Sequence, residues 1–248
     1  MKNAVVTGTS SGIGEATARL LAQRDYRVIG IARRADRLEQ LAAEAGDKFI
    51  PLPLDLTSTD APARVREAVD GEFGGKLDLL VNNAGGAWRS AFADEEKGGW
   101  ENVRRTMELN FDSVVRLTEA LLPVLRASAP SAIVNVASVA GRASRPKSGA
   151  YSASKAAVIA WTDALHLEEK PNNVHVGTVS PGFIATEGFP QTDIKPHWIV
   201  SKPEKVAEAI FKAGPGGKPE VIVPRGYALI PALRALTPGL VRRGASGV

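Results

Sequence analysis

The sequence of 248 residues contains no cysteine, which excludes disulfide bonds, thiolate catalysis and cysteine-ligated metals. A chain without cysteine is also compatible with a reducing compartment. The three histidines, His166, His175 and His197, do not have the H-x-x-x-H spacing that holds zinc on one face of a helix. We therefore expect no metal site in this protein.

Long apolar runs are also absent. No stretch approaches the roughly 18 consecutive apolar residues that a membrane-spanning helix needs, and the apolar run in MKNAVVTGTSSG is too short for a signal peptide. The net charge is only +4, from 31 basic and 27 acidic residues spread along the chain, so the basic stripe of a nucleic-acid-binding protein is missing. These features predict a soluble, cytoplasmic protein without a transmembrane segment and without nucleic acid as a partner.

What the sequence does contain is an alternation of short β-branched runs with longer helical patterns. The strand candidates are NAVVT, YRVIGIA, KFIPLPL, LDLLVNN, SAIVNVAS, VHVGTVS and PEVIVP, and the helical patterns cover 13–24, 34–45, 60–71, 101–126, 151–169 and 203–213. Continuous apolar strands that alternate with helices are typical of a parallel sheet covered on both faces. The pattern predicts an α/β fold with one doubly wound, mostly parallel sheet.

Two segments lie outside this alternation. Residues 183–202 are rich in proline, glycine and aromatic residues, and residues 226–248 form a basic, proline-interrupted tail. Because long insertions after a strand often cover binding sites, we expect 183–202 to be a substrate lid. We expect the tail to belong to the same single domain as the rest of the chain.

A glycine-rich turn, TGTSSGIG at residues 7–14, follows the first strand candidate. Gly8, Gly12 and Gly14 leave room for backbone N–H groups to approach a phosphate at the N-terminus of the next helix. Their spacing, G-x-x-x-G-x-G, differs from the G-x-G-x-x-G dinucleotide fingerprint but follows the same physical logic. A glycine-rich turn without any ligand is the alternative interpretation.

The stretch GAYSASKAAV, at residues 149–158, has Tyr151 and Lys155 as its only large polar residues. Residues four apart share one face of a helix, so the phenol and the ammonium are expected side by side. A nearby ammonium lowers the pKa of a phenol because it favours the phenolate, so this tyrosine could exchange a proton at neutral pH. For this pair alone, a buried tyrosine beside a lysine without a chemical role is the alternative.

Several short motifs follow one another along the chain: T-G-x-x-x-G-I-G at 7–14, NNAG at 82–85, Ser138, Tyr151 with Lys155, and PGFIAT at 181–186. In this order they resemble the short-chain dehydrogenase/reductase family, over roughly residues 3–223. The resemblance implies a Rossmann-type dinucleotide-binding and catalytic domain over residues 1–225. It also implies a nicotinamide cofactor and, as the commonest activity, the interconversion of alcohols and carbonyl compounds.

The resemblance assigns roles to individual residues. Tyr151 would be the general acid or base, Ser138 would donate a hydrogen bond to the substrate oxygen, and Lys155 would lower the tyrosine pKa and bind the nicotinamide ribose. Asn110, in MELNF, would hold a water that links Lys155 to solvent; an exposed helical asparagine is the alternative. The expected cofactor contacts, besides Tyr151 and Lys155, are Gly8, Ser10, Ser11, Gly12 and Ile13 at the phosphates, Asp55 at the adenine, Asn82, Ala84 and Gly85 at the ribose and the middle of the cofactor, and Ile184 and Thr186 at the carboxamide.

The choice of cofactor depends on the end of the second strand candidate. Enzymes that use NAD tend to carry an acid there for the ribose hydroxyls, whereas an arginine accommodates the 2′-phosphate of NADP. This chain has Ala32 followed by Arg33 and Arg34, so we expect NADP(H) to be preferred over NAD(H), with Arg33 as the main contact. A basic surface at a helix start is the alternative, although cations are unfavourable at that end of the helix dipole.

Aromatic residues lie near the expected site, and they are compatible with an apolar substrate pocket or with ordinary packing. They are Trp88 and Phe92 after NNAGG, and Phe183, Phe189, His197 and Trp198 in the lid candidate. Arg142 and Arg145 lie between the serine and the tyrosine, where they could meet an acidic group or simply lie on the surface.

The joint presence of Ser138, Tyr151 and Lys155 favours an enzyme over the alternative, a nucleotide-binding redox sensor without turnover, which has no need of all three. We expect a homo-oligomer. Pairing through the helices at 101–126 and 151–169 predicts a homodimer, and a tetramer stays open although the chain lacks the DGG ending of many tetrameric members of the resembling family. The tail could be a lid, a partner-binding helix or a weak membrane-surface contact.

Overall fold

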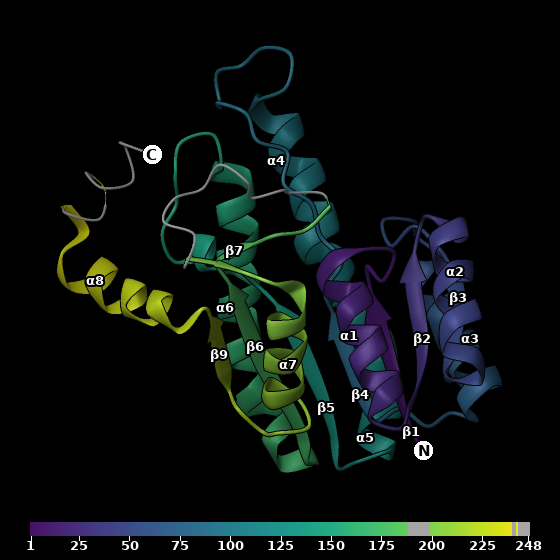
Figure 1. The fold of residues 1–248 in the computed structure, drawn as a ribbon. Helices are drawn as coiled ribbons and strands as arrows, with labels where there is room; N and C mark the ends of the chain where they lie inside the picture. The colour runs from purple at the N-terminus through teal and green to yellow at the C-terminus, as the bar shows by residue number, and fades with distance from the viewer. Residues whose placement is uncertain (188–198, 240–241, 243–248) are drawn as a thin grey trace.

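The computed structural model describes residues 1–187, 199–239 and 242, and its centre is a seven-stranded sheet (Figure 1). All neighbouring strands are parallel, which confirms the predicted doubly wound α/β fold. From one edge to the other the strands are β3 (Phe49–Pro53), β2 (Tyr26–Ala32), β1 (Lys2–Thr7), β4 (Leu79–Asn82), β5 (Ser131–Val136), β6 (Val174–Pro181) and β9 (Glu220–Val223).

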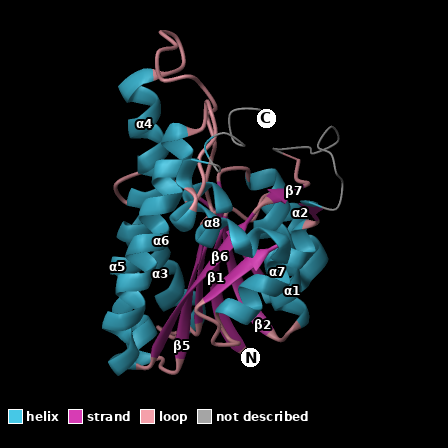
Figure 2. Ribbon diagram, turned by 90° about the vertical axis from the view of Figure 1, so that its left-hand side faces the viewer, coloured by secondary structure: helices cyan, strands magenta, loops and turns pink. Residues whose placement is uncertain are grey.

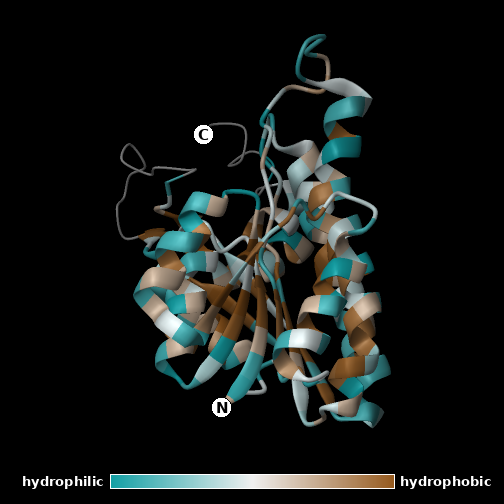
Figure 3. Ribbon diagram, turned by 90° about the vertical axis from the view of Figure 1, so that its right-hand side faces the viewer, coloured by the Kyte–Doolittle hydropathy of each residue, from teal (hydrophilic) through white to brown (hydrophobic). Residues whose placement is uncertain are grey.

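Helices cover both faces of this sheet, as Figure 2 shows. One layer contains α1 (Gly12–Gln23), α2 (Ala35–Ala45) and α7 (Pro203–Ala213), and the other contains α3 (Ala61–Phe73), α5 (Ser113–Ala127) and α6 (Gly149–Glu169), with α4 (Gly99–Met107) packed against α6. Within β1, Ala4 and Val6 belong to the core cluster of the first layer and Val5 to that of the second, because successive side chains alternate across a strand. Burial on both faces explains the continuous apolar strands, which are the brown centre of Figure 3.

The helical pattern predicted at 101–126 is interrupted in the structure. Helix α4 ends at Met107, a π-helical turn covers Glu108–Asp112, and α5 begins at Ser113. A π-helical turn inserts an extra residue into a helix and occurs frequently at functional sites. Here the turn carries Asn110 into the buried interior.

The two segments that lay outside the alternation are partly described. Residues Phe183–Ile184 (β7) and Val200–Ser201 (β8) pair as a small parallel sheet, while Phe189, His197 and Trp198 of the predicted lid lie outside the described residues. The tail begins with a 3-10 helix at Arg225–Leu229 and continues as α8 (Ile230–Leu236). No helix in the described part of the chain is long and apolar enough to cross a membrane.

The topology creates a crevice at the carboxyl edge of the sheet. From β1 the chain moves outward through β2 and β3, and later through β4, β5 and β6 on the other side. The loops after β1 and β4 therefore diverge, and such a switch point is where ligands bind in open α/β sheets.

Candidate active site

A cavity of about 1160 Å³ lies over this crevice. It is lined by the loops that follow β1, β2, β4, β5 and β6, and also by residues of the tail. Motifs that are far apart in the sequence therefore share one hollow, with the glycine-rich turn on the β1 side and Ser138 and Tyr151 on the β5 side.

The glycine-rich turn is a compact backbone loop. Gly8 and Gly12 have φ angles of +75° and +61°, which strain residues that carry a side chain. A Cβ added to Gly14 would lie only 2.1 Å from the backbone oxygen of Gly8, so the start of α1 packs directly on the turn. The predicted phosphate contacts all line the cavity: Gly8, Ser10, Ser11, Gly12 and Ile13. A phosphate there would meet the N–H groups at the N-terminus of α1.

Positive charge gathers where β2 ends. Arg33 is exposed and lines the cavity, and its charge contributes to holding the pKa of Asp55 below the usual value. The larger cause of that lowered pKa is the backbone N–H of Thr57, which donates to Asp55 Oδ1 at 2.9 Å. Arg34 donates to the Ser10 backbone oxygen at 3.1 Å and lies 3.5 Å from a Glu187 carboxylate oxygen. Arg33, Arg34 and Asp55 all line the cavity, and Arg34 also holds the glycine-rich turn through Ser10.

The NNAG motif after β4 is placed differently from the prediction for Asn82. Asn82 is buried away from the cavity, where its Nδ2 donates to Asn135 Oδ1 at 2.8 Å and to Thr118 Oγ1 at 3.1 Å. The next residue, Asn83, lines the cavity, and its Nδ2 donates to the Thr7 backbone oxygen at 2.8 Å. Neighbouring residues of a strand direct their side chains to opposite faces of the sheet. Asn82 pairs in register with an asparagine of β5, and this partner was the signal in the sequence that Asn82 is turned away from the cavity. Ala84 and Gly85 line the cavity.

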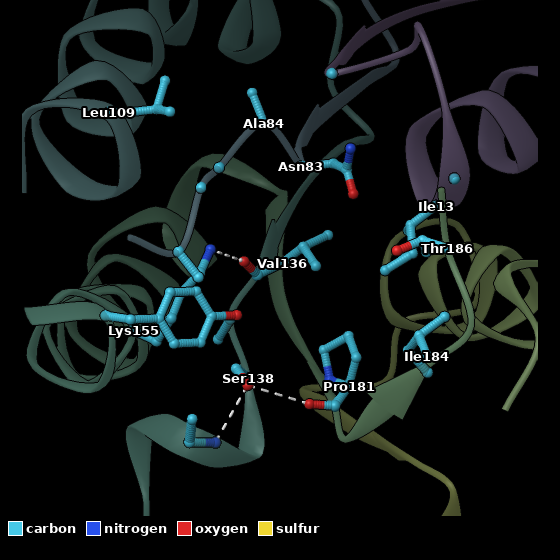
Figure 4. Close-up of a pocket in the computed structure, with 18 of the residues that line it drawn as sticks. Ile13, Asn83, Ala84, Leu109, Val136, Ser138, Lys155, Pro181, Ile184 and Thr186 are labelled. Carbon is cyan, nitrogen blue, oxygen red and sulfur yellow. Dashed lines mark hydrogen bonds between the residues drawn. The ribbon is translucent and has the colours of Figure 1, made fainter. Parts of the chain in front are cut away.

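Ser138 and Lys155 are fixed by backbone oxygens, as Figure 4 shows. Ser138 Oγ donates to the Pro181 oxygen at 3.3 Å and accepts from the Ala140 N–H at 3.1 Å. Lys155 Nζ is buried and donates to the Val136 oxygen at 2.8 Å. Tyr151 lies one turn before Lys155 on α6, and its ring centroid is 5.9 Å from Lys155 Nζ. The three side chains therefore meet at one wall of the cavity.

The electrostatics of this wall correct one expectation. Burial raises the pKa of the Tyr151 phenol, while the Ser138 hydroxyl, within hydrogen-bonding reach of the phenol, and the positive charge of Arg89 act in the opposite direction. Lys155 is not among the groups that lower the tyrosine pKa. Burial disfavours the charged ammonium of Lys155 and lowers the pKa of the lysine itself to about 8. In the protein alone, Tyr151 is thus a protonated acid beside a lysine that titrates near neutrality.

Asn110 is buried, which rules out the exposed-asparagine interpretation. Its Oδ1 accepts from the Gly86 N–H at 2.8 Å, and its Nδ2 donates to the Gly86 oxygen at 2.9 Å and to Ser154 Oγ at 3.0 Å. A Cβ added to Gly85 would lie 3.0 Å from Asn110 Oδ1 and 3.4 Å from Lys155 Nζ. Asn110 therefore lies behind the cavity wall, where it fixes the loop after β4 next to the lysine.

The segment after β6 closes the cavity from the other side. Ile184 and Thr186 both line the cavity. A Cβ added to Gly12 would lie 3.1 Å from Thr186 Cγ2, so this segment reaches the glycine-rich turn. Pairing of β7 with β8 holds Ile184 in a buried position.

The tail also forms part of the cavity, which the sequence left open. Tyr227, Ile230 and Leu233 line it, and the rings of Phe183 and Tyr227 pack edge to face with centroids 6.4 Å apart. The cavity lining does not include Trp88 or Phe92. Trp88 instead packs against Arg105, whose Cζ is 5.1 Å from its ring centroid, and Phe92 lines a separate hollow of about 300 Å³.

The donor set of the cavity fits a dinucleotide and not a metal. Among the described residues there is no group of three histidines, cysteines or carboxylates that could hold a metal ion. The compact glycine turn, by contrast, presents backbone N–H groups at a helix N-terminus, and the basic end of β2 lies beside it. A nicotinamide cofactor placed along the cavity would run from Arg33 past the glycine turn to the wall with Tyr151.

Comparisons with known proteins agree with this geometry. The family model described as short chain dehydrogenase matches residues 2–195. The chain is 37% identical to the 3-oxoacyl-(acyl-carrier-protein) reductase of Vibrio cholerae over 75% of each chain, and 36% identical to the cis-4-hydroxycyclohexanecarboxylate dehydrogenase of Sinomonas cyclohexanicum over 84% of this chain and 86% of that one. A short chain dehydrogenase from Burkholderia cenocepacia, solved in complex with NADP, superposes with a TM-score of 0.83 at 27% identity, covering 99% of both chains.

Proposed function

Because this chain belongs to the short-chain dehydrogenase family and is an NAD(P)-dependent oxidoreductase of carbonyl and alcohol groups, we propose that it prefers NADP(H) and interconverts a ketone and a secondary alcohol on a small, mainly apolar substrate. The observation that carries the proposal is the convergence of Ser138, Tyr151 and Lys155 on one wall of a cavity whose far end is a glycine-rich turn. One end suits a dinucleotide phosphate and the other suits proton transfer.

The residues proposed to hold the cofactor are all among those that line the cavity. Gly8, Ser10, Ser11, Gly12 and Ile13 would hold the phosphates, Asp55 the adenine, Ala84 and Gly85 the middle, and Ile184 and Thr186 the carboxamide. Asn83 replaces Asn82 in this set, since Asn83 faces the cavity. When bound, the cofactor supplies or accepts the hydride.

The protein's own part of the chemistry is proton transfer. The phenol of Tyr151 gives a proton to the substrate oxygen during reduction, and a raised pKa keeps that phenol protonated at neutral pH. The Ser138 hydroxyl, positioned by its contacts with Ala140 and Pro181, stabilises the charge that develops on the same oxygen. Ser138 is buried and Tyr151 is half-buried, and the lower local dielectric strengthens these interactions.

Lys155 and Asn110 support this step. A lysine whose pKa lies at about 8 can release and regain a proton near neutral pH, and its ammonium would also bind the nicotinamide ribose. Asn110 is a positioning residue, since it binds both backbone groups of Gly86 beside the lysine. We propose that a water held near Asn110 links Lys155 to solvent.

The preference for NADP(H) is proposed from the end of β2. Ala32 occupies the position where enzymes that use NAD tend to carry an acidic residue, so no negative charge is present there. Arg33 lines the cavity, and Arg34 donates a hydrogen bond to Ser10 of the glycine-rich turn. A guanidinium can bind a 2′-phosphate through two parallel hydrogen bonds.

A direct test is the oxidation of NADPH by the purified protein against a panel of ketones, aldehydes and quinones. We expect turnover on at least one apolar ketone, at a lower rate with NADH, and none with Tyr151→Phe. Binding of NADPH without turnover on any member of the panel would contradict the proposal and favour a redox sensor.

A further inference from the structure

Two arginines line the substrate end of the cavity, where apolar residues otherwise dominate. Arg89 lies in the loop after β4, and Arg145 lies in the loop between Ser138 and Tyr151. The positive charge of Arg89 acts on the Tyr151 phenol, which places this guanidinium close to the reacting end. Both loops lie on the β4–β5–β6 side of the switch point, opposite the β2 and β3 side that carries Arg33.

Arg145 is held in a half-buried position against an aromatic ring. Its Cζ is 4.5 Å from the ring centroid of Phe183, and no carboxylate of the described residues forms an ion pair with it. Arg142, three residues earlier, is different, because its guanidinium donates to both carboxylate oxygens of Glu220 at 2.9 Å. Burial lowers the pKa of Arg145, and the positive charge of Arg89 adds to this effect, while the Tyr227 phenol acts in the opposite direction.

The described lining of the cavity contains one carboxylate, Asp55, and it lies at the adenine end. The substrate end therefore combines positive charge with apolar surface from Phe183, Tyr227 and Leu233. A buried cation favours a bound oxyanion, and an arginine fork matches the two oxygens of a carboxylate.

The loops that carry the two arginines are fixed before any ligand binds. The Ser90 N–H donates to the Lys147 oxygen at 3.1 Å, which joins the loop of Arg89 to the loop of Arg145. On one side Asn102 Nδ2 donates to the Trp88 oxygen at 3.1 Å, and on the other Ser148 Oγ donates to the Arg145 oxygen at 2.7 Å. These hydrogen bonds fix the backbone of both loops, so the loops lose little entropy when a ligand binds.

We propose that the substrate of this enzyme is a carbonyl compound with an apolar body and a carboxylate, and that Arg145 binds that carboxylate. This inference rests on the proposed function. The carbonyl lies at Ser138 and Tyr151, the apolar body lies against Phe183 and Tyr227, and the carboxylate points to Arg145. No covalent step is added, so the arginines act on binding and selectivity.

The test compares keto acids with their own methyl esters, which keep the carbonyl and the apolar body but remove the charge. A series of aryl and alicyclic ketones that differ in the distance between carbonyl and carboxylate would be assayed with NADPH, and kcat/KM would be measured for each acid and ester. Isothermal titration of the same pairs into the protein saturated with NADP⁺ gives a second readout that does not need turnover.

We expect the best acid to exceed its ester about tenfold to 100-fold in kcat/KM and in affinity, as a charge-assisted bidentate contact would give. Arg145→Ala should bring the acid-to-ester ratio close to one, and Arg145→Lys should restore part of the preference. The matched control is Lys147→Asn, which removes a cation two residues away at a backbone position with a φ of +62° that asparagine tolerates. It should leave the acid-to-ester ratio unchanged.

The outcomes separate this inference from the proposed function. Equal reduction of acids and esters, or an acid preference that survives Arg145→Ala, would overturn the carboxylate site while the reductase assignment stands. Acids that bind more tightly than esters in an Arg145-dependent way, without turnover of either, would support the carboxylate site and refute the proposed reaction. A well-folded Arg145→Ala is established by an unchanged NADPH affinity.

Discussion

The two ends of the cavity are built in different ways. The phosphate end consists mainly of backbone from one continuous stretch, Gly8 to Ile13, shaped by glycines that no other residue could replace without a clash or strain. The substrate end consists of side chains from separate segments: the loop with Arg89, the loop with Arg145, Phe183 after β6, and the tail with Tyr227 and Leu233. The first construction is the one proposed to bind the phosphates, which all nicotinamide dinucleotides share, and the second can change without disturbing the first.

This difference separates cofactor recognition from substrate selectivity. A backbone cradle at a helix N-terminus binds phosphate through N–H groups that are insensitive to side-chain replacement. Side chains on loops fixed by a rigid sheet can be exchanged one at a time, and each exchange alters which substrate is stabilised. Variants at the two ends should therefore affect different measured constants.

We expect Tyr151→Phe to show the largest difference between the two ends of the cavity, since it should affect turnover and not cofactor binding. The change removes only the phenol hydroxyl, so the proton for the substrate oxygen is lost while the ring and its packing remain. We expect kcat to fall at least about 100-fold, and the dissociation constant of NADPH to change less than about twofold. Steady-state kinetics and cofactor titration check this result. A variant that retained full activity would remove Tyr151 from the chemistry.

The arginine at the end of β2 tests the cofactor end. Arg33→Ala should weaken NADPH binding about tenfold to 100-fold and leave the affinity for NADH nearly constant, because only the 2′-phosphate would lose a charge-assisted contact. The double variant Ala32→Asp/Arg33→Ala should shift the preference towards NADH, since a carboxylate repels the phosphate and accepts from ribose hydroxyls. Dissociation constants for both cofactors decide the matter. Equal affinity of the wild type for NADPH and NADH would leave Arg33 as a surface charge.

Much of this site could be predicted from local patterns. Gly8, Gly12 and Gly14 are a continuous motif, and Tyr151 and Lys155 share a helix face because they are four residues apart. The apolar runs predicted the strands, since parallel strands are buried on both faces. In each case the residues of one short stretch are sufficient to predict its local geometry.

The rest depended on contacts that a local pattern does not contain. Asn82 was expected at the cofactor, but strand alternation turns it towards Asn135, and only the registered pairing of β4 with β5 reveals this. The pKa of Tyr151 was expected to fall beside Lys155, but burial of both residues dominates and raises the tyrosine pKa. The tail's place at the cavity is a tertiary contact between Tyr227 and Phe183, which are far apart in sequence.

A single methyl group should damage the phosphate end. Gly14→Ala places a Cβ 2.1 Å from the Gly8 oxygen, so the turn and the start of α1 must separate. We expect a loss of about 1–3 kcal/mol in the free energy of unfolding, as for other overpacked sites, and about a tenfold loss of NADPH affinity. Gly71→Ala is the matched control, because its added Cβ, in the last turn of α3, meets nothing within 4 Å. That control should raise stability by about 0.5–1 kcal/mol and leave the cofactor affinity unchanged.

The smallest effect should come from the tail, where two leucines of α8 form a matched pair. Leu233 lines the cavity, whereas Leu236, on the same helix, is 81% exposed and is not part of the lining. Leu233→Ala removes apolar surface that a substrate would cover, so kcat/KM for an apolar ketone should fall about threefold to tenfold, while the NADPH dissociation constant stays the same. Leu236→Ala should change neither constant. If both variants lowered kcat/KM equally, the tail would act through the stability of α8 and not through contact with the substrate. If Leu233→Ala weakened NADPH binding instead, α8 would contribute to the cofactor end. The distinction between a cofactor end built from backbone and a substrate end built from side chains would then be wrong for this helix.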